Sequence, residues 1–297
     1  MDTTFSQTVS LPKRTTRKFR IRKFILSAIA ILFTIAPLLS LSLWIHTTYF
    51  SDPRGTIALQ AISATDKPLQ PFETPMVSVT FDDGWESVYR HGAPILSKYQ
   101  IPTTQYILSG QFDHYSYLSQ EQVLSLQKAG HDIQSHTITH SDLKRVSDEQ
   151  LTQELEQSKR DISTLIGTTT TDFASPLNSY DERTLREIKQ HYRSHRTTVA
   201  SVDQPTDKDF NLKSNFNQWE IVAFSVRRNT TAQQIENYLK EAAKRNAWAV
   251  LVYHEIDAES SSYYAVTPQE FDAQMKTVKN SGLQITTMDQ TLDTLLR

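Results

Sequence analysis

The sequence predicts an α/β protein in which parallel strands alternate with crossover helices over most of its length. Short runs rich in β-branched, aromatic and other apolar residues, such as 77–81 and 247–253, alternate with segments that carry helix-start signals. In addition, side chains capable of chemistry follow three of the strand-like runs, at residues 82–83, 136 and 254. Ligands and catalytic groups of α/β folds gather beyond the carboxyl ends of the strands. The pattern therefore predicts the fold class and the edge of the sheet where a site would lie.

Composition sets the size of the protein and limits its chemistry. The chain has 297 residues, of which 38% are hydrophobic and 10% aromatic, enough for the core of one barrel-sized domain and an additional segment. It contains no cysteine, which excludes disulfides and thiolate metal sites. The absence of cysteine is compatible with a cytoplasmic or an extracytoplasmic location, so the compartment must be inferred from another feature.

The N-terminus supplies that feature. Residues 1–23 are a basic tail, and residues 24–45 form an uncharged apolar run of 22 residues, long enough for a helix to span a bilayer. The positive-inside rule keeps the basic tail in the cytoplasm, so residues 76–297 are expected outside it. We predict a retained, single-pass anchor in the cell membrane, while the small residues Ser40 and Ser42, two positions apart, leave open a cleaved signal peptide.

A segment with four prolines follows the predicted anchor. Residues 46–75 contain Pro53, Pro68, Pro71 and Pro75 among scattered polar residues, which is typical of a spacer. Without the tail and the anchor, the remaining chain is acidic, with a net charge of about −8. An acidic domain is a poor electrostatic match for nucleic acid, so we expect no nucleic-acid partner, and neutral glycans remain good candidates.

Capping signals define the helices expected within residues 76–297. Ser119-x-x-Gln122 and Ser147-x-x-Gln150 have the spacing of capping boxes, and Thr267-Pro268-Gln269-Glu270 combines an N-cap, a proline at the first helical position and a capping-box glutamate. Helices are expected at 87–99, 119–130 and 147–166, from 181, 231 and 267, and at the C-terminus. Strands are expected at 77–81, 103–108, 130–134, 171–175, 192–200, 220–226, 247–253 and 283–287. This alternation implies one α/β domain without internal repeats.

The first strand-like run ends at Asp82, Asp83 and Gly84, two adjacent carboxylates followed by a glycine. Neighbouring carboxylates repel one another unless a cation or a shared proton separates their roles. On its own, the same stretch is equally compatible with a solvated turn in which an aspartate caps the next helix. Other motifs in the chain must decide between a site and a turn.

Two histidines, His136 and His140, follow another strand-like run and lie four residues apart. We interpret this spacing as one face of a helical turn, from which both imidazoles reach a single metal ion. With one aspartate they form a 2-His-1-carboxylate face, which leaves coordination positions open for water and substrate. A histidine pair alone is commonly structural, but the run 251–253 is followed by a further histidine, His254, late in the chain.

In this order, residues 80–84, 136–140 and 251–254 resemble the motifs of the polysaccharide deacetylases of the NodB-homology type, carbohydrate esterase family 4. The resemblance covers roughly residues 76–295. It implies a distorted (β/α) barrel of about seven strands. The apolar run at 24–45 adds one N-terminal transmembrane helix before this barrel. The resemblance also implies metal-dependent removal of acetyl groups from N-acetylated sugar polymers.

The resemblance implies roles for individual residues. The residues that correspond to the family's metal ligands are Asp83, His136 and His140, with Zn2+ or a similar divalent ion as the cofactor. Asp82 corresponds to the catalytic base that takes a proton from water, and His254 to the general acid that protonates the departing sugar nitrogen. The backbone N–H of Leu177, which follows Pro176, corresponds to the group that contacts the oxyanion.

The sequence departs from the family pattern in two places. Many members have an arginine paired with the catalytic base where this chain has Ala174. Arg193 or Arg196 could substitute, although each is more simply interpreted as a surface charge. The family's Asp-x-x-Asp-Trp segment is not evident, and Trp219 is either its remnant or a core residue. The aromatic residues that could either stack on sugar rings or pack within the protein are Trp85, Tyr115, Tyr117, Tyr263 and Tyr264.

The leading hypothesis is a membrane-anchored, metal-dependent N-deacetylase. Its substrate would be an extracytoplasmic glycan that contains N-acetylglucosamine, either cell-wall peptidoglycan or a surface polysaccharide. Alternatives are a catalytically weak or silent glycan-binding barrel, motivated by the missing arginine, and an O-acetyl esterase on another glycan. Iron oxygenases also use two histidines and a carboxylate, but on a β-sandwich that the alternating pattern does not resemble. Fold analogy does not identify the polymer.

Overall fold

The computed structural model describes residues 55–62 and 69–296. The predicted basic tail, the predicted transmembrane helix at 24–45 and part of the predicted spacer lie outside these residues. Among the helices of the described ranges, none is both long and apolar enough to cross a bilayer.

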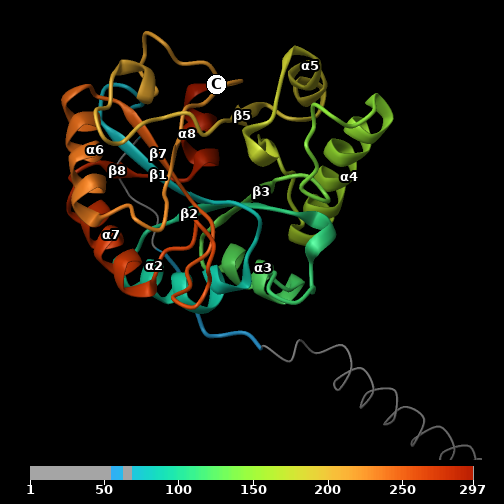
Figure 1. Cartoon of the computed structure of the whole chain (residues 1–297), viewed down its shortest axis with the longest axis horizontal. Coiled ribbons are helices and arrows are strands. Elements are labelled where there is room, and N and C mark those ends of the chain that lie inside the picture. The colour runs from blue at the N-terminus through green and yellow to red at the C-terminus, as the bar shows by residue number, and fades with distance from the viewer. Residues whose placement is uncertain (1–54, 63–68, 297) are drawn as a thin grey trace, which may run out of the picture. The chain divides into compact units, whose positions relative to one another are not determined.

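A parallel sheet of seven strands, with an eighth strand paired to its centre, forms the framework of the domain (Figure 1). The seven strands follow the order β5-β4-β3-β2-β1-β7-β6, and β8 pairs with β1. The strands are β1 (Met76–Phe81), β2 (Thr103–Ile107), β3 (Asp132–Ser135), β4 (Asp172–Ala174), β5 (Ser194–Arg196), β6 (Phe224–Ser225), β7 (Trp248–Tyr253) and β8 (Gln284–Ile285). Every pairing between them is parallel. The α/β class predicted from the sequence is therefore confirmed.

Helices alternate with the strands along the chain and surround the sheet in Figure 1. They are α2 (Ala93–Tyr99), α3 (Gln120–Lys128), α4 (Asp148–Ile166), α5 (Glu182–His191), α6 (Ala232–Lys244), α7 (Pro268–Asn280) and α8 (Met288–Leu295). A π-helical turn at Val88–Gly92 leads into α2. This arrangement covers the sheet with the apolar faces of the helices, as expected for parallel strands.

Backbone hydrogen bonds also link the two edges of the sheet. Arg196, the last residue of β5, forms a parallel bridge with Ile221, which lies shortly before β6. Thr197 N donates to the Ile221 carbonyl at 2.8 Å, and Ala200 N to the Ala223 carbonyl at 3.1 Å. The end of β5 is thus held against the segment that leads into β6, which favours a barrel-like course of the sheet.

Two of the predicted strands, 192–200 and 220–226, are much shorter in the structure, where they form β5 and β6. Asparagine side chains interrupt them. Asn178 Oδ1 accepts the backbone N–H of Thr198, and Asn211 Oδ1 accepts that of Val222, both at 2.9 Å. Because these N–H groups are occupied by side chains, they do not extend the ladder between strands.

The buried centre of the sheet is the pair β1 and β7. They pair residue by residue, from Met76 opposite Trp248 to Phe81 opposite Tyr253, and every residue of both strands is buried. The rings of Phe81 and Tyr253 also contact Phe271 of α7, with centroids 5.8 and 5.2 Å away. Burial of a side chain of this size contributes about 1.5–3 kcal/mol. The two strands that precede Asp82 and His254 are therefore among the most firmly packed parts of the domain.

The capping boxes predicted at Ser119 and Ser147 are confirmed at the starts of α3 and α4. Thr267 caps α7 as predicted, but the assignment of Glu270 to a capping box is wrong. The Glu270 carboxylate instead accepts the backbone N–H of Ala232, at the start of α6, at 2.6 Å. Glu270 of α7 therefore connects the two helices, because it accepts an N–H group in the first turn of α6 that has no acceptor within its own helix.

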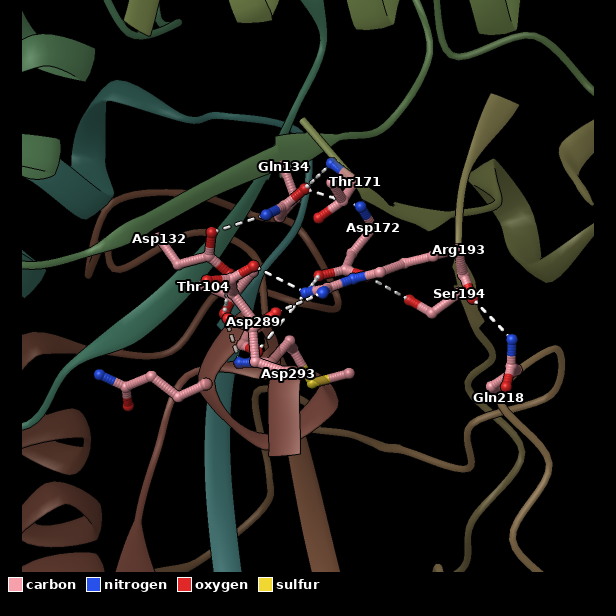
Figure 2. Close-up of polar contacts among 12 residues, drawn as sticks. Thr104, Asp132, Gln134, Thr171, Asp172, Arg193, Ser194, Gln218, Asp289 and Asp293 are labelled. Atoms are coloured by element: carbon pink, nitrogen blue, oxygen red, sulfur yellow. Dashed lines mark hydrogen bonds and ion pairs between the residues drawn. The ribbon is translucent and has the colours of Figure 1, made fainter. Parts of the chain in front are cut away.

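An ionic cluster lies where β3, β4 and β5 begin, at the end of the strands opposite the predicted site (Figure 2). Arg193 donates to Asp172 Oδ1 at 3.0 Å and to Asp289 Oδ1 at 2.7 Å, and it also bonds Asp293. Its interpretation as a surface charge is wrong, because its side chain is only 26% exposed and joins β4 to α8. Arg193 therefore fixes the C-terminal helix to the sheet.

Asp132, the first residue of β3, belongs to the same cluster. Its carboxylate accepts hydrogen bonds from Thr104 Oγ1 at 2.9 Å and Gln134 Nε2 at 2.7 Å. Burial, together with the nearby charges of Asp172 and Asp289, raises the pKa of Asp132 from 3.8 to about 7. In the folded protein the Asp132 carboxyl therefore keeps its proton up to a higher pH than it does in the unfolded chain.

This difference predicts how stability depends on pH. A carboxyl group with a raised pKa in the folded state stabilises the fold fully below about pH 3.8, and this stabilisation is lost as the pH rises to about 7. The free energy of unfolding should therefore contain a component that decreases over this range. Asp132→Asn should remove that component, as measured by urea unfolding at several pH values. Asp148→Asn, at a side chain that is 83% exposed, is the control and should leave the slope unchanged; equal slopes in all three proteins would contradict the prediction.

Candidate metal centre and active site

The structure brings the predicted site residues to the carboxyl edge of the sheet. Asp82 and His254 directly follow Phe81 and Tyr253, which pair across β1 and β7. Asp82 N also donates to the Tyr253 carbonyl at 2.9 Å, so the ladder continues to the first of the two aspartates. His136 directly follows β3. Because all strands are parallel, these side chains share one end of the fold.

Asp83, His136 and His140 form a cluster with the geometry of a metal site. The Nε2 atoms of His136 and His140 lie 3.4 and 3.2 Å from Asp83 Oδ1, and the three candidate ligand atoms lie within 4.8 Å of one another. Within the described part of the chain, Asp83 Oδ1 is buried and accepts no hydrogen bond. Two imidazole nitrogens and one unpaired carboxylate oxygen are donors that suit Zn2+ and similar divalent ions, so these residues fit the cofactor that the sequence implies.

The segment between the two histidines is not helical, so the predicted helical turn is wrong. Thr137 and His140 have positive φ values of 78° and 64°, which place them in the left-handed region. A buried carboxylate from α4 holds the resulting loop: Glu154 Oε2 accepts the backbone N–H groups of Ile138 and Thr139 at 2.8 and 3.0 Å. Both imidazoles therefore approach Asp83 because Glu154, a residue outside the loop, holds the loop in place. The spacing of the histidines did not indicate this role of Glu154.

The orientation of His136 is set by its second ring nitrogen. Nδ1 lies 2.8 Å from the carbonyl of Ala174, the last residue of β4, and must donate to it. Nε2, which faces Asp83, is consequently the nitrogen whose lone pair a metal ion would use. Backbone support of this kind fixes the tautomer and the ring plane of metal-binding histidines.

The arginine that the sequence lacks at position 174 is supplied by the neighbouring strand. Arg196 donates to Asp82 Oδ1 at 2.5 Å, and the two side chains are only 1% and 5% exposed. Arg196 lies directly opposite Ala174 in the register of β4 and β5. Its interpretation as a surface charge is therefore wrong. A sequence pattern could not reveal this role, because it depends on which residues of two strands face each other.

Burial and neighbouring charges compete at the site. Burial raises the pKa of Asp83, but contacts with His136 and His140 outweigh burial and hold this pKa well below 3.8. Burial lowers the pKa of His140, yet the contact with Asp83 outweighs it and leaves the pKa above 6.5. For His254, burial dominates over Asp82 and Asp83 and lowers the pKa. An ionised carboxylate and a neutral His254 imidazole are therefore favoured at neutral pH.

Leu177 lies in the turn after β4, with a positive φ of 58° and a side chain that is 65% exposed. The start of this turn is fixed by Ser175, whose hydroxyl lies 2.8 Å from His195 Nε2. His195 Nδ1 must donate to the Trp219 carbonyl at 2.8 Å, so Nε2 accepts the proton of Ser175. Since Ala174 carries the carbonyl that holds His136, the turn lies beside the candidate metal centre.

The aromatic residues singled out from the sequence have different surroundings. Trp219 packs against the core between α4 and α5, which favours its core interpretation. Trp85 stacks on Tyr117 with ring centroids 4.6 Å apart, and Tyr264 packs on the ring of His254 at 4.7 Å. The side chains of Tyr115 and Tyr263 are 93% and 53% exposed. Trp85 and Tyr264 therefore flank site residues directly.

Taken together, fold and site define a parallel α/β protein with a candidate mononuclear metal centre at the carboxyl ends of its strands. Residues 70–193 match the family described as polysaccharide deacetylase. The Bacillus subtilis (strain 168) protein YxkH, whose name assigns it provisionally to these deacetylases, is 29% identical over 165 residues, which are 54% of this chain and 58% of YxkH. The matched regions span 48% to 58% of the length of three curated relatives.

Solved structures show the same fold. The Xyl-CE4 domain of a multidomain xylanase from the hindgut metagenome of Trinervitermes trinervoides has a TM-score of 0.53 at 19% identity, over 75% of this chain and 91% of that domain. The peptidoglycan deacetylase PdaC from Bacillus subtilis has a TM-score of 0.53 at 16% identity, over 77% and 94% of the two chains. The resemblance noted in the motifs is confirmed by the family model, which matches residues 70–193.

Proposed function

We propose that the protein is a divalent-metal-dependent hydrolase that removes N-acetyl groups from a glycan containing N-acetylglucosamine, either peptidoglycan or a surface polysaccharide. The observation that carries this proposal is the juxtaposition of two features. Three candidate ligand atoms lie within 4.8 Å of one another, and the adjacent residue Asp82 is a buried carboxylate fixed by Arg196. The family match of residues 70–193 supports the same reaction class.

The residues would divide the reaction among them. A divalent ion held by Asp83, His136 and His140 would acidify a bound water and polarise the acetyl carbonyl. Asp82 would accept the proton of the attacking water, with Arg196 holding its carboxylate in one orientation. His254, in its protonated form, would donate a proton to the departing amine, and the backbone N–H of Leu177 would contact the developing negative charge.

One observation favours an O-acetyl esterase as the second candidate. His254 Nδ1 is buried and has no hydrogen-bond partner among the described residues. An imidazole without a partner at its second nitrogen is less stabilised as a cation, so a smaller fraction of it carries the proton that a departing amine needs. The alkoxide of an ester leaves more readily, so an ester substrate depends less on this residue.

Acetate release tests the proposal and separates the candidates. The full-length protein, loaded with Zn2+, would be incubated with peptidoglycan, chitin oligomers, poly-N-acetylglucosamine and acetylated xylan, with and without a chelator. Chelator-sensitive release from an N-acetylated polymer supports the proposal, and release from acetylated xylan alone supports the esterase. Binding to a glycan without release from any substrate would overturn both and favour a silent glycan-binding barrel.

Replacement of His254 provides a prediction about acid catalysis. His254→Ala should lower turnover on an N-acetyl amide by about two to four powers of ten, because general acid catalysis contributes this much. Turnover of an aryl acetate ester should fall less, since its leaving group scarcely needs a proton, and Zn2+ content should not change. Equal losses on the two substrates would remove His254 from the role of the acid.

We also propose that residues 24–45 anchor the protein in the cell membrane, with residues 46–75 as a spacer and residues 76–297 outside the cytoplasm. The basic tail at 1–23 supports this orientation. A reporter enzyme fused after Arg297 should be active only outside the cytoplasm. Activity inside would reject the orientation.

A further inference from the structure

The turn after β1 brings Trp85 back against the candidate ligand Asp83. Trp85 Nε1 donates a hydrogen bond to Asp83 Oδ2 at 2.9 Å, whereas Asp83 Oδ1 faces His136 and His140. The two oxygens of one carboxylate therefore have different surroundings. We propose that Trp85 is a positioning residue that holds Asp83 so that it binds the ion through one oxygen only. This inference rests on the metal centre of the proposed function.

The backbone explains why residue 85 can reach residue 83. Asp83 and Gly84 both have positive φ values, 73° and 80°, so the chain reverses within two residues of the end of β1. A Cβ atom on Gly84 would lie 3.2 Å from Ile107 Cγ2, in addition to the strain of its φ value. Glycine is therefore required where the indole must return to the carboxylate.

Neighbouring residues restrict the rotation of the indole. The Trp85 ring stacks on Tyr117 with an interplanar angle of 19°. Two backbone hydrogen bonds of 2.8 Å, Leu118 N to the Gly84 carbonyl and Glu86 N to the Ser116 carbonyl, hold the segments on either side together. The direction of the indole N–H is thus fixed before any ion binds, as effective support of a metal ligand requires.

The hydrogen bond has a consequence for coordination. An oxygen that accepts an N–H is less available to a cation, so Asp83 would occupy one coordination position through Oδ1. With two histidines, this leaves positions open for water and substrate. A phenylalanine at position 85 would retain an aromatic ring beside Tyr117 but would leave Asp83 Oδ2 without its N–H donor.

The test compares Trp85→Phe with the wild type in the full-length protein, with Zn2+ as the probe. The apparent Kd for Zn2+, measured by competition with a chromophoric chelator, should rise by about 10- to 100-fold in Trp85→Phe. The visible spectrum of the Co2+-loaded protein should also change, because release of Oδ2 alters the coordination of the ion. Neither readout depends on turnover.

Trp248→Phe is the matched control, because it removes an indole hydrogen bond of similar length, 3.0 Å to Ser78 Oγ. Trp248 begins β7, at the end of the strand remote from His254. This variant is expected to lose stability but to keep the Zn2+ affinity and the Co2+ spectrum of the wild type. Wild-type values in Trp85→Phe would overturn the role of Trp85 while leaving the proposed function intact. A wild-type protein that binds no Zn2+ would instead overturn the metal centre itself.

Discussion

Arg196→Met is expected to lower acetate release by about 100-fold, because a small displacement of a catalytic group has an effect of this size. It should also lower the free energy of unfolding by about 3–5 kcal/mol, since removal of one partner leaves a buried charge without compensation. Both side chains are almost completely buried, and the Arg196 guanidinium lies 2.5 Å from Asp82 Oδ1. Water therefore cannot easily replace the lost guanidinium. Initial rates with saturating Zn2+ and urea unfolding measure the two effects.

The register of the sheet offers a way to restore the arginine in a second variant, Arg196→Ala. Ala174 and Arg196 face each other on adjacent parallel strands, whose backbones lie about 4.8 Å apart. In the double variant Ala174→Arg and Arg196→Ala, the arginine would occupy the position that it has in many family members. We expect this double variant to recover most of the activity that Arg196→Ala loses, because Asp82 regains a cation from the same side of the site.

Arg193→Met is the control for a general effect of arginine loss. It breaks the bonds to Asp172 and Asp289 at the opposite end of the strands, so it should lower stability while the folded protein keeps its rate of acetate release. Full activity in Arg196→Met, or equal loss of activity in both single variants, would show that Arg196 does not support the base.

The sequence predicted the alternation of strands and helices along the chain better than it predicted the surroundings of the side chains. Asp82 and His254 could be placed at one edge because each follows an apolar run, and parallel strands bring such ends together. The two arginines could not be distinguished, because both stand in a polar stretch around β5. Arg193 lies just before the strand and bonds Asp289 of α8, whereas Arg196 ends the strand and bonds Asp82.

The histidine spacing shows a second limit of sequence analysis. A separation of four residues fits a helical turn, and it fits a loop that reverses direction through Thr137 and His140 equally well. The choice depends on Glu154, which follows His140 by fourteen residues and satisfies the backbone N–H groups of the loop. A tertiary contact of this kind overrides the local preference and leaves no local signal in the sequence.

Replacement of the neighbouring aspartates Asp82 and Asp83 by asparagine, one at a time, should impair two different steps, catalysis in the first variant and Zn2+ binding in the second. Asp82 continues the β1–β7 ladder through its N–H, whereas Asp83 has a φ of 73° and begins the turn. The two carboxylates consequently diverge, the first to Arg196 and the second to the histidines. Adjacent residues of identical chemistry therefore have separate expected tasks.

Asp82→Asn keeps a polar side chain of the same shape but cannot accept the proton of water. Zn2+ should remain at about one ion per chain, while acetate release falls by about two to four powers of ten, the usual contribution of a general base. Asp83→Asn removes an anionic ligand, so the Kd for Zn2+ should rise first, and an excess of the ion should restore part of the activity. Metal analysis after dialysis and rates measured over a range of Zn2+ concentrations distinguish the two defects. If metal content collapsed in Asp82→Asn and survived in Asp83→Asn, the two roles would have to be exchanged. Full activity in both variants would exclude the proposed mechanism, because neither carboxylate would then take part in it.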